Sequence, residues 1–476
     1  MTAPSPKQLG RPPRVAILGA GISGLSAAYE LSLGAQRQGR RLELMVLEAS
    51  TRIGGKVTTE SREGIIVEGG PDSFIGAKPE ALELIDELGL SQEVIGTNPC
   101  RRPIQVLSGG RLESLPEFGL APSSPWPWLA SPLLSWRGKL RMCLEPLVPG
   151  EQGHQDESIA SFFRRRLGAE ALDKIFAPMF GGIYAGDCEK LSLQSTFPQL
   201  REMERKGGLL RSMQSAKRAP RPRSGFMTLR GGLTRLIEAL ARALPGGVVR
   251  AGAKVESVAR RGGSWELGVN GELFKVDAVI SALPAPAVSA LLSDVDFELS
   301  CALREIPFVS TATVSLALER AQFKRPLQGF GFLIPRAEGR RIIGATFSSS
   351  KFPGRAPENT ALIRCFVGGA GQEELAEAPD EEILRSVSAE LKDILRMDSF
   401  KPALSRVFRW PKANPQYLVG HALKLKRIAS CLQGHPGLWL TGCSFEGVSL
   451  PDCIRSGRRA GVQAFQWVCG RRHAGS

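Results

Sequence analysis

A glycine loop between an apolar run and a helical pattern constrains the fold of this chain more than any other feature. Residues 14–28 read RVAILGAGISGLSAA, in which an aliphatic run ends at Gly19 and apolar residues at helical spacing follow Gly21. Gly19 permits a sharp turn, Gly21 lets a phosphate approach the backbone, and Gly24 lets the helix pack against the strand. The first-turn amides of the helix would then face a pyrophosphate. The sequence therefore predicts a strand–loop–helix cradle for a dinucleotide.

A second apolar run, LELMVLE, ends at Glu48, which lies 27 residues after Gly21. An acid at this position accepts hydrogen bonds from ribose hydroxyls. A nicotinamide-binding domain would continue with another helix, whereas this chain continues with the pair Gly54-Gly55. The pair could form a simple turn, or it could bring more backbone toward a longer ligand such as a flavin nucleotide.

The charge balance narrows the ligand class. The chain has 62 basic and 47 acidic residues, a net charge of +15, which suits an anionic small molecule or an anionic membrane surface. The stretch 201–223 concentrates basic residues without alternating aromatic ones. It therefore predicts a mobile basic loop and no nucleic-acid partner.

The remaining composition excludes several classes. Nine cysteines without a C-x-x-C pair argue against a disulfide framework or a zinc site, and four scattered histidines offer no catalytic triad. We therefore expect no metal. The sequence lacks an apolar leader and any run of about 18 apolar residues, which predicts a cytoplasmic protein without a membrane span.

Particular motifs carry a family resemblance. The pattern E-x-x-x-R-x-G-G, here formed by Glu48, Arg52, Gly54 and Gly55, resembles the signature of the FAD-binding amine oxidase superfamily. Residues 161–200, which contain GGIYAGD, and the later GCSFEGVSLPDCI are similar to the oxygen-dependent porphyrinogen oxidases of haem biosynthesis. That family includes protoporphyrinogen IX oxidases and bacterial coproporphyrinogen III oxidases.

The resemblance implies an α/β (α+β) fold in three parts. A discontinuous Rossmann-like FAD-binding domain would be joined by a mixed-sheet substrate-binding domain and a helical insertion that can contact a membrane. The FAD-binding domain would comprise residues 1–98, 225–300 and 405–476, the substrate-binding domain 99–115 and 301–404, and the helical insertion 116–224.

The resemblance also implies a set of site residues, and no side chain among them is expected to be the catalyst because the flavin carries the chemistry. The residues expected to bind FAD are Gly19, Gly21, Ile22, Ser23, Gly24, Glu48, Ala49, Arg52, Gly55, Lys56, Gly70, Pro71, Asp72, Ser73, Val255, Trp410, Val448, Ser449 and Leu450. The residues expected to contact substrate are Gly182, through its backbone, and Phe330, Leu333 and Phe366.

The implied reaction is a six-electron oxidation of a porphyrinogen, either coproporphyrinogen III or protoporphyrinogen IX, with O2 as acceptor and H2O2 as product. Ile104 stands where many protoporphyrinogen oxidases have an arginine, which favours coproporphyrinogen III. Two alternatives stay open. One is another flavin amine oxidase, such as a polyamine oxidase or a carotenoid desaturase, and the other is a non-catalytic flavin-binding protein. The positive net charge argues against a cationic polyamine.

Association is the last expectation. Trp126, Trp128 and Trp136 lie near basic residues, a combination that predicts peripheral contact with lipid headgroups or, alternatively, a buried channel wall. By resemblance, a ferrochelatase or a second copy of this chain is expected as a protein partner.

Overall fold

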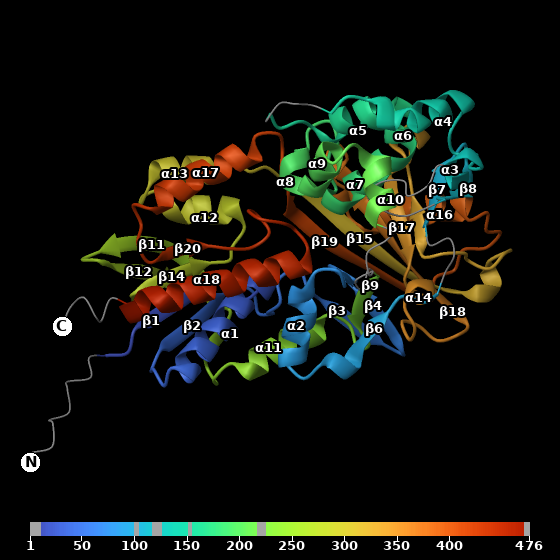
Figure 1. The fold of residues 1–476 in the computed structure, drawn as a ribbon. Coiled ribbons are helices and arrows are strands. Elements are labelled where there is room, and N and C mark those ends of the chain that lie inside the picture. The colour runs from blue at the N-terminus through green and yellow to red at the C-terminus, as the bar shows by residue number, and fades with distance from the viewer. Residues whose placement is uncertain (1–10, 100–103, 117–125, 151–154, 217–224, 471–476) are drawn as a thin grey trace, which may run out of the picture.

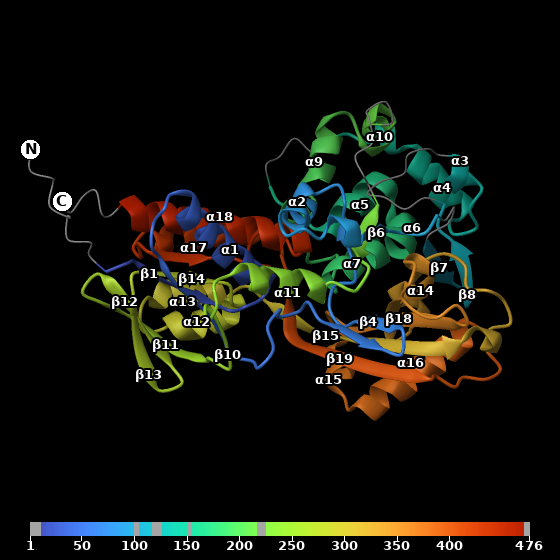
Figure 2. The same ribbon diagram turned by 90° about the horizontal axis from the view of Figure 1, so that it is seen from below.

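Two sheets organise the protein. The structure, a computed structural model, describes residues 11–99, 104–116, 126–150, 155–216 and 225–470. One half contains a parallel sheet, the other half contains a mixed sheet, and a group of helices lies above the mixed sheet (Figure 1). The same division is visible from below (Figure 2).

The parallel sheet has the strand order β10-β2-β1-β14-β20. Its strands are β1 (Arg14–Leu18), β2 (Glu43–Glu48), β10 (Val249–Ala251), β14 (Ala278–Ser281) and β20 (Leu438–Leu440). The apolar runs that predicted β1 and β2 are buried because helices or strands cover both faces of the sheet. Strands from three distant parts of the sequence therefore build one Rossmann-like parallel sheet.

One face of this sheet is covered by α1 (Ile22–Arg37), α11 (Thr234–Ala243) and α18 (Leu450–Gly470). Helix α18 begins near the centre of the molecule and runs back along α1 (Figure 1). The two helices touch because Gly457 faces Ser23: a Cβ on Gly457 would lie 2.2 Å from the Ser23 carbonyl oxygen.

The other face is covered by an antiparallel meander and three helices. These elements are β11 (Val255–Arg261), β12 (Ser264–Val269), β13 (Glu272–Val276), α12 (Ala285–Leu292), α13 (Phe297–Arg304) and α17 (His421–Leu432).

The mixed sheet has the order β19-β15-β18-β17-β16-β7-β8. Its face with Val314 and Cys365 packs on α16 (Asp380–Ile394), and the alternating residues Thr313, Arg364 and Phe366 face the opposite side. The strands are β7 (Ile104–Ser108), β8 (Arg111–Ser114), β15 (Phe308–Glu319), β16 (Gly331–Leu333), β17 (Ile342–Phe347), β18 (Thr360–Gly368) and β19 (Leu404–Pro415).

A helical group packs over that opposite side around buried aromatic residues. Phe163 stacks on Phe176 with ring centroids 4.3 Å apart and on Phe180 at 5.1 Å. The elements are α3 (Trp126–Leu129), α4 (Trp136–Cys143), η2 (Glu145–Leu147), α5 (Ile159–Leu167), α6 (Ala169–Ala171), the π-helical turn η3 (Leu172–Phe176), α7 (Ala177–Tyr184), α8 (Leu193–Thr196), α9 (Pro198–Arg205) and α10 (Leu209–Ala216).

One expectation for this helical group is wrong. The stretch predicted as a basic loop is helical over α9 and α10, and Arg201 pairs with Glu204 at 2.8 Å and with Glu157 at 3.0 Å. Residues 217–224 of that stretch lie outside the described residues. Trp128 is buried in the helical core, which for this residue agrees with the alternative of a buried wall.

Short elements connect these layers. They are β3 (Thr59–Arg62), β4 (Ile65–Glu68), β5 (Phe74–Ile75), α2 (Pro79–Glu87), η1 (Ser91–Glu93), β6 (Val94–Gly96), β9 (Phe226–Leu229), η4 (Arg320–Gln322), η5 (Arg336–Glu338), α14 (Ser348–Lys351) and α15 (Glu373–Glu377). Within the described ranges, no helix has the length and apolar character needed to cross a bilayer.

Candidate functional site

The glycine loop after β1 forms an open cradle at the start of α1. Gly19 has a φ of 96°, which favours glycine, and a Cβ on Gly24 would lie 1.9 Å from the Gly19 carbonyl oxygen. A Cβ on Gly21, in contrast, would meet nothing within 4 Å. Helix α1 begins at Ile22 with no side-chain cap and no acidic residue in its first turn. Its first amides, including that of Ser23, are therefore placed to receive an anion.

The acid predicted at the end of the second strand closes one side of the cradle. The Glu48 carboxylate accepts a hydrogen bond from the Ala20 amide at 2.9 Å and another from the Ser50 amide at 3.0 Å. These bonds fix the carboxylate next to the loop, and its remaining lone pairs can accept hydrogen bonds from a ribose. Ala49 is exposed beside it. Val255 lies nearby at the start of β11, two residues after Ala253, whose amide donates to the Glu48 carbonyl at 2.8 Å.

The second glycine pair packs directly against the first loop. The Gly54 amide donates to the Ala20 carbonyl at 2.8 Å, and a Cβ on Gly55 would lie 3.3 Å from the Gly21 Cα. Arg52 shapes this loop, since its guanidinium donates to the carbonyls of Gly55 at 2.6 Å and Val57 at 3.1 Å. The pair thus extends the cradle instead of forming an isolated turn.

The turn 69–73 continues the cradle toward the mixed sheet. Gly70 lies against Lys56, because a Cβ on Gly70 would be 1.7 Å from the Lys56 carbonyl oxygen. The Gly69 carbonyl accepts hydrogen bonds from the sheet, from Trp410 Nε1 at 2.9 Å and from Thr313 Oγ1 at 3.0 Å. The indole predicted to bind cofactor therefore holds this turn through its N–H group.

Charged residues fix the rest of the turn, beyond Pro71. Lys351 Nζ lies 3.0 Å from Asp72 Oδ2 and 3.1 Å from Ser73 Oγ, and Arg364 donates to the carbonyls of Gly69 and Gly70. Burial raises the pKa of the Asp72 carboxyl, but Lys351 and Arg364 outweigh burial and hold that pKa well below its usual range. Asp72 is therefore ionised whenever the protein is folded near neutral pH.

The C-terminal loop reaches the same region from the other side. The Tyr417 hydroxyl donates to the Cys443 carbonyl at 2.7 Å, and Lys56 Nζ donates to the Ala413 carbonyl at 2.5 Å. Lys78 pairs with Asp452 at 2.7 Å in the first turn of α18. Three residues predicted to bind cofactor lie where this loop meets α18: Val448, Ser449, whose Oγ accepts from the Asp452 amide at 3.4 Å, and Leu450.

The residues predicted to contact substrate lie on the sheet and on the helix above it. Phe366 pairs in register with Gly344, and Gly344 pairs with Leu333, so both side chains belong to the sheet face that looks away from α16. Phe330 precedes β16 and is half-buried. Gly182 is exposed near the end of α7, and a Cβ there would meet nothing within 4 Å. The Arg364 guanidinium lies over the Phe366 ring, with its central carbon 5.0 Å from the ring centroid.

The end of α7 is tied to the mixed sheet. Ala185 ends the helix with a φ of 49°, and its carbonyl accepts from the Ala370 amide at 2.8 Å, just beyond β18. Gln416 Nε2 also donates to the Tyr184 carbonyl at 2.8 Å. The segment around Gly182 therefore keeps a fixed position relative to the strand that carries Phe366.

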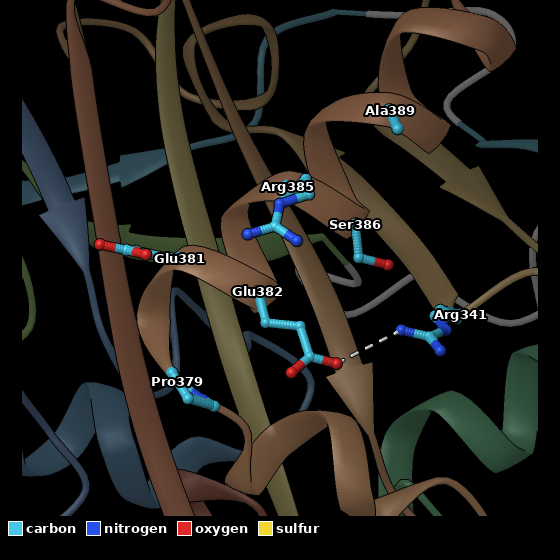
Figure 3. A pocket seen from close by; sticks show the side chains of 7 residues that line it. All are labelled: Arg341, Pro379, Glu381, Glu382, Arg385, Ser386 and Ala389. Carbon is cyan, nitrogen blue, oxygen red and sulfur yellow. Dashed lines mark ion pairs between the residues drawn. The ribbon is translucent and has the colours of Figure 1, made fainter.

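A cavity of about 550 Å³ lies elsewhere and takes no part in this site. It opens on α16, on the covered side of the mixed sheet, and Figure 3 shows Arg341 and Glu382 directed toward one another across it. Their closest atoms are 3.8 Å apart. Its lining residues are Arg341, Pro379, Glu381, Glu382, Arg385, Ser386 and Ala389. This charged hollow lacks the flat apolar walls that a macrocyclic substrate needs.

Three residues of the site escaped the sequence analysis. Arg364 was detectable, because it interrupts the apolar run TALIRCFVG of β18. Lys351 and Tyr417 gave no local signal, since their partners lie far away in the sequence.

Comparison with known proteins decides the family. The family model described as flavin containing amine oxidoreductase matches residues 22–464. The chain belongs to that family. Its cofactor is FAD. The cradle fits this cofactor, because Gly21 faces open space, α1 begins without a cap, and the Gly54-Gly55 pair extends the backbone surface beyond a single nucleotide loop.

Relatives of this flavoprotein have assigned activities. The chain is 34% identical to the coproporphyrinogen III oxidase of Bacillus subtilis (strain 168), over 95% of this chain and 98% of the relative. It is 29% identical to protoporphyrinogen oxidase 2 of Arabidopsis thaliana, over 94% and 92%. A crystal structure from Exiguobacterium sp. 255-15, to which a protoporphyrinogen oxidase function is attributed, has a TM-score of 0.86, 30% identity, and coverage of 95% and 98%.

Proposed function

We propose that this flavoprotein oxidises coproporphyrinogen III to coproporphyrin III in haem biosynthesis, with O2 as acceptor and H2O2 as product. The observation that carries the proposal is the likeness to named enzymes along nearly the whole chain. Three relatives named coproporphyrinogen III oxidase are each 34% identical to it, whereas the relatives named protoporphyrinogen oxidase are 29–31% identical. Protoporphyrinogen IX is the second candidate substrate.

The arrangement of this chain's residues suits that substrate class. Bound FAD supplies the acceptor for hydride removed from a saturated bridge carbon. The protein's own task is to bind and orient a flat macrocycle, for which Phe366 and Leu333 provide an apolar wall and Gly182 leaves room on the helical side. The described residues contain no cluster suited to a metal ion. The proposed chemistry needs none.

Anaerobic mixing tests the substrate. The purified flavoprotein is mixed separately with coproporphyrinogen III and protoporphyrinogen IX, and flavin absorbance is followed by stopped flow. We expect both to bleach the flavin, with coproporphyrinogen III at least about tenfold faster, because two further carboxylates favour binding to a basic protein. A faster reaction with protoporphyrinogen IX would reverse the substrate assignment, and no bleaching with either would refute the oxidase.

A variant of Gly182 locates the reaction. Gly182→Val should retain FAD and slow bleaching by about 100-fold, because its side chain would occupy the open space beside α7. Gly246→Val is a matched control, since Gly246 also has nothing within 4 Å of its Cβ position but lies near the parallel sheet. Equal rates in the two variants would remove Gly182 from the site.

We also propose that the helical group rests on the cytoplasmic face of an anionic membrane. Trp136 is 77% exposed, Leu140 63% and Leu147 74%, and the neighbouring Arg137 is exposed. Exposed aromatic and aliphatic side chains beside cations suit a lipid-headgroup interface. The described cysteines are free thiols, which agrees with a reducing compartment.

Liposome flotation measures this contact. The double variant Trp136→Glu/Leu140→Glu should reduce the fraction floating with phosphatidylglycerol vesicles by at least about fivefold, because both apolar area and charge attraction are lost. Phe297→Glu changes a similarly exposed residue, 74% exposed on α13, and should leave flotation unchanged. Equal flotation of the Trp136→Glu/Leu140→Glu and Phe297→Glu variants would contradict the proposed membrane-contacting surface. Delivery of product to a ferrochelatase and pairing with a second copy also remain proposals.

A further inference from the structure

Four buried charged residues lie beside the turn 69–73 and form one group with Asp72, the half-buried carboxylate of that turn. Lys351, Arg355 and Arg364 face Glu68 and Asp72, and we call this group the buried charge cluster. The whole-residue exposure of Lys351 is 8%, that of Arg355 2% and that of Arg364 4%. The three cations outnumber the two carboxylates, so the ionised cluster carries excess positive charge in a dry part of the protein.

The cluster is attached to the turn by direct contacts. Lys351 binds Asp72 and Ser73 as described above, and Arg364 donates to two carbonyls of the turn. Arg355 lies further back, with Nη2 3.5 Å from Glu68 Oε1 and 2.7 Å from Thr228 Oγ1. A change of charge at Lys351 therefore acts within one residue contact of the turn.

The positive charge of the cluster is incompletely compensated. Arg355 Nη1 and Arg364 Nε are buried and have no hydrogen-bond partner among the described residues. Burial lowers the pKa of both arginines, against the opposing charges of Glu68 and Asp72. Burial also raises the pKa of Glu68 to about 6, despite Arg355. The excess of one cation over the carboxylates and the two unpaired buried donors indicate a local positive potential, which negative charge nearby would relieve.

We propose that Lys351 is a positioning residue whose charge, acting through Asp72 and the turn 69–73, increases the electron affinity of bound FAD. The inference rests on the proposed binding of FAD by that turn, where Gly70 contacts Lys56 at the far end of the glycine cradle. Electrons gained by the ring bring negative charge, which a nearby buried cation stabilises. Arg364 strengthens the same effect while it holds the turn in place.

Sulfite is a probe of this potential, because it adds a negative charge to oxidised flavin without any porphyrinogen. At pH 8, where Glu68 is ionised, Lys351→Met should weaken sulfite binding about tenfold. Lys351→Arg should stay within about twofold of the parent protein, since the charge is retained. Asp72→Asn should tighten sulfite binding, because it removes a negative charge from the cluster. Lys324→Met is the matched control: Lys324 pairs with Asp398 at 2.7 Å on the exposed side of the molecule and should have no effect.

The opposite signs separate electrostatics from structure. If Lys351→Met and Asp72→Asn both weaken sulfite binding, or both lose FAD, the cluster is merely a structural clamp and the proposal is wrong. An unchanged sulfite affinity in Lys351→Met also overturns it. The flavin midpoint potential gives a second measurement, and a tenfold effect corresponds to a fall of about 30 mV for a two-electron couple. If the midpoint potential falls as expected in Lys351→Met but porphyrinogens do not reduce the flavin of the parent protein, the proposed function alone is refuted.

Discussion

Replacing Gly24 with alanine should destabilise the protein even when no cofactor is present. The added Cβ would lie 1.9 Å from the Gly19 carbonyl oxygen and 3.3 Å from the Ala282 Cβ, so β1 and α1 would have to separate. Overpacking of a tight core costs about 1–3 kcal/mol, and a clash with backbone belongs at or above the upper end. We expect a loss of at least about 3 kcal/mol and no retained FAD.

Gly21→Ala is the matched variant that separates folding from cofactor binding. Gly21 has a φ of −74°, which alanine tolerates, and its Cβ would meet no protein atom within 4 Å. The free energy of unfolding of the apoprotein should change by less than about 0.5 kcal/mol. FAD affinity should nevertheless fall about 100-fold, or about 2.7 kcal/mol, because the methyl group occupies ligand space. Urea unfolding of the apoproteins and FAD titration measure the two effects, and equal apoprotein stability in both variants would contradict the packing argument.

The cradle was predictable because its residues interact over short sequence distances. Gly19 and Gly24 pack against one another within a single turn, and Glu48 ends a strand adjacent to β1. The apolar runs specify both strands, and the glycines specify the turn between strand and helix. The position of the Gly54-Gly55 pair needed one further prediction, namely that its backbone lies against the first glycine loop.

The buried charge cluster was not predictable from local pattern. Lys351 meets Asp72 across 279 residues, and Arg364 meets Gly70 across 294. Hydrophobic periodicity specifies which face of a strand is buried, but it does not specify which distant turn will cover that face. Arg364 in an apolar strand indicates a buried cation, but the sequence does not indicate which residues contact it.

The helical group shows how composition can mislead. Glycines and arginines in 201–223 suggested a loop, yet Gly207 and Gly208 merely separate two short helices, with φ values of 102° and 111°. Arg201 is spaced three residues from Glu204, a helical spacing that overall charge conceals. A prediction based on the number of charges, without their spacing, therefore misses helix α9.

Replacing Arg166 with methionine should disrupt this helical group. Arg166 on α5 is buried beside Glu145, and its Nη1 donates to the Val148 carbonyl at 2.7 Å. The same carboxylate accepts from the Leu209 amide at 2.8 Å and the Leu210 amide at 3.2 Å at the start of α10. Without the guanidinium, a buried negative charge remains unpaired, which costs about 3–5 kcal/mol.

The consequence for function follows from the packing of α5. Its Phe163 stacks on Phe176 and Phe180, and Phe180 belongs to the helix that carries Gly182. Arg166→Met should therefore slow porphyrinogen oxidation by more than about tenfold while FAD stays bound, and should hasten proteolysis between α4 and α10. Arg164→Met is the matched control, because Arg164 makes an exposed pair with Glu189 that is worth at most about 1 kcal/mol.

A double variant isolates the buried charge as the cause. Glu145→Gln keeps an oxygen for the α10 amides but removes the charge, so Arg166→Met/Glu145→Gln should recover at least about 1 kcal/mol relative to Arg166→Met. The comparison uses urea unfolding of the FAD-bound proteins and limited proteolysis of the same samples. If the double variant is less stable than Arg166→Met, the loss comes from the packing of the arginine stem, and the charge argument fails. Recovery would show that the carboxylate tolerates burial because the guanidinium neutralises it, and that α10 is held in place by the same group.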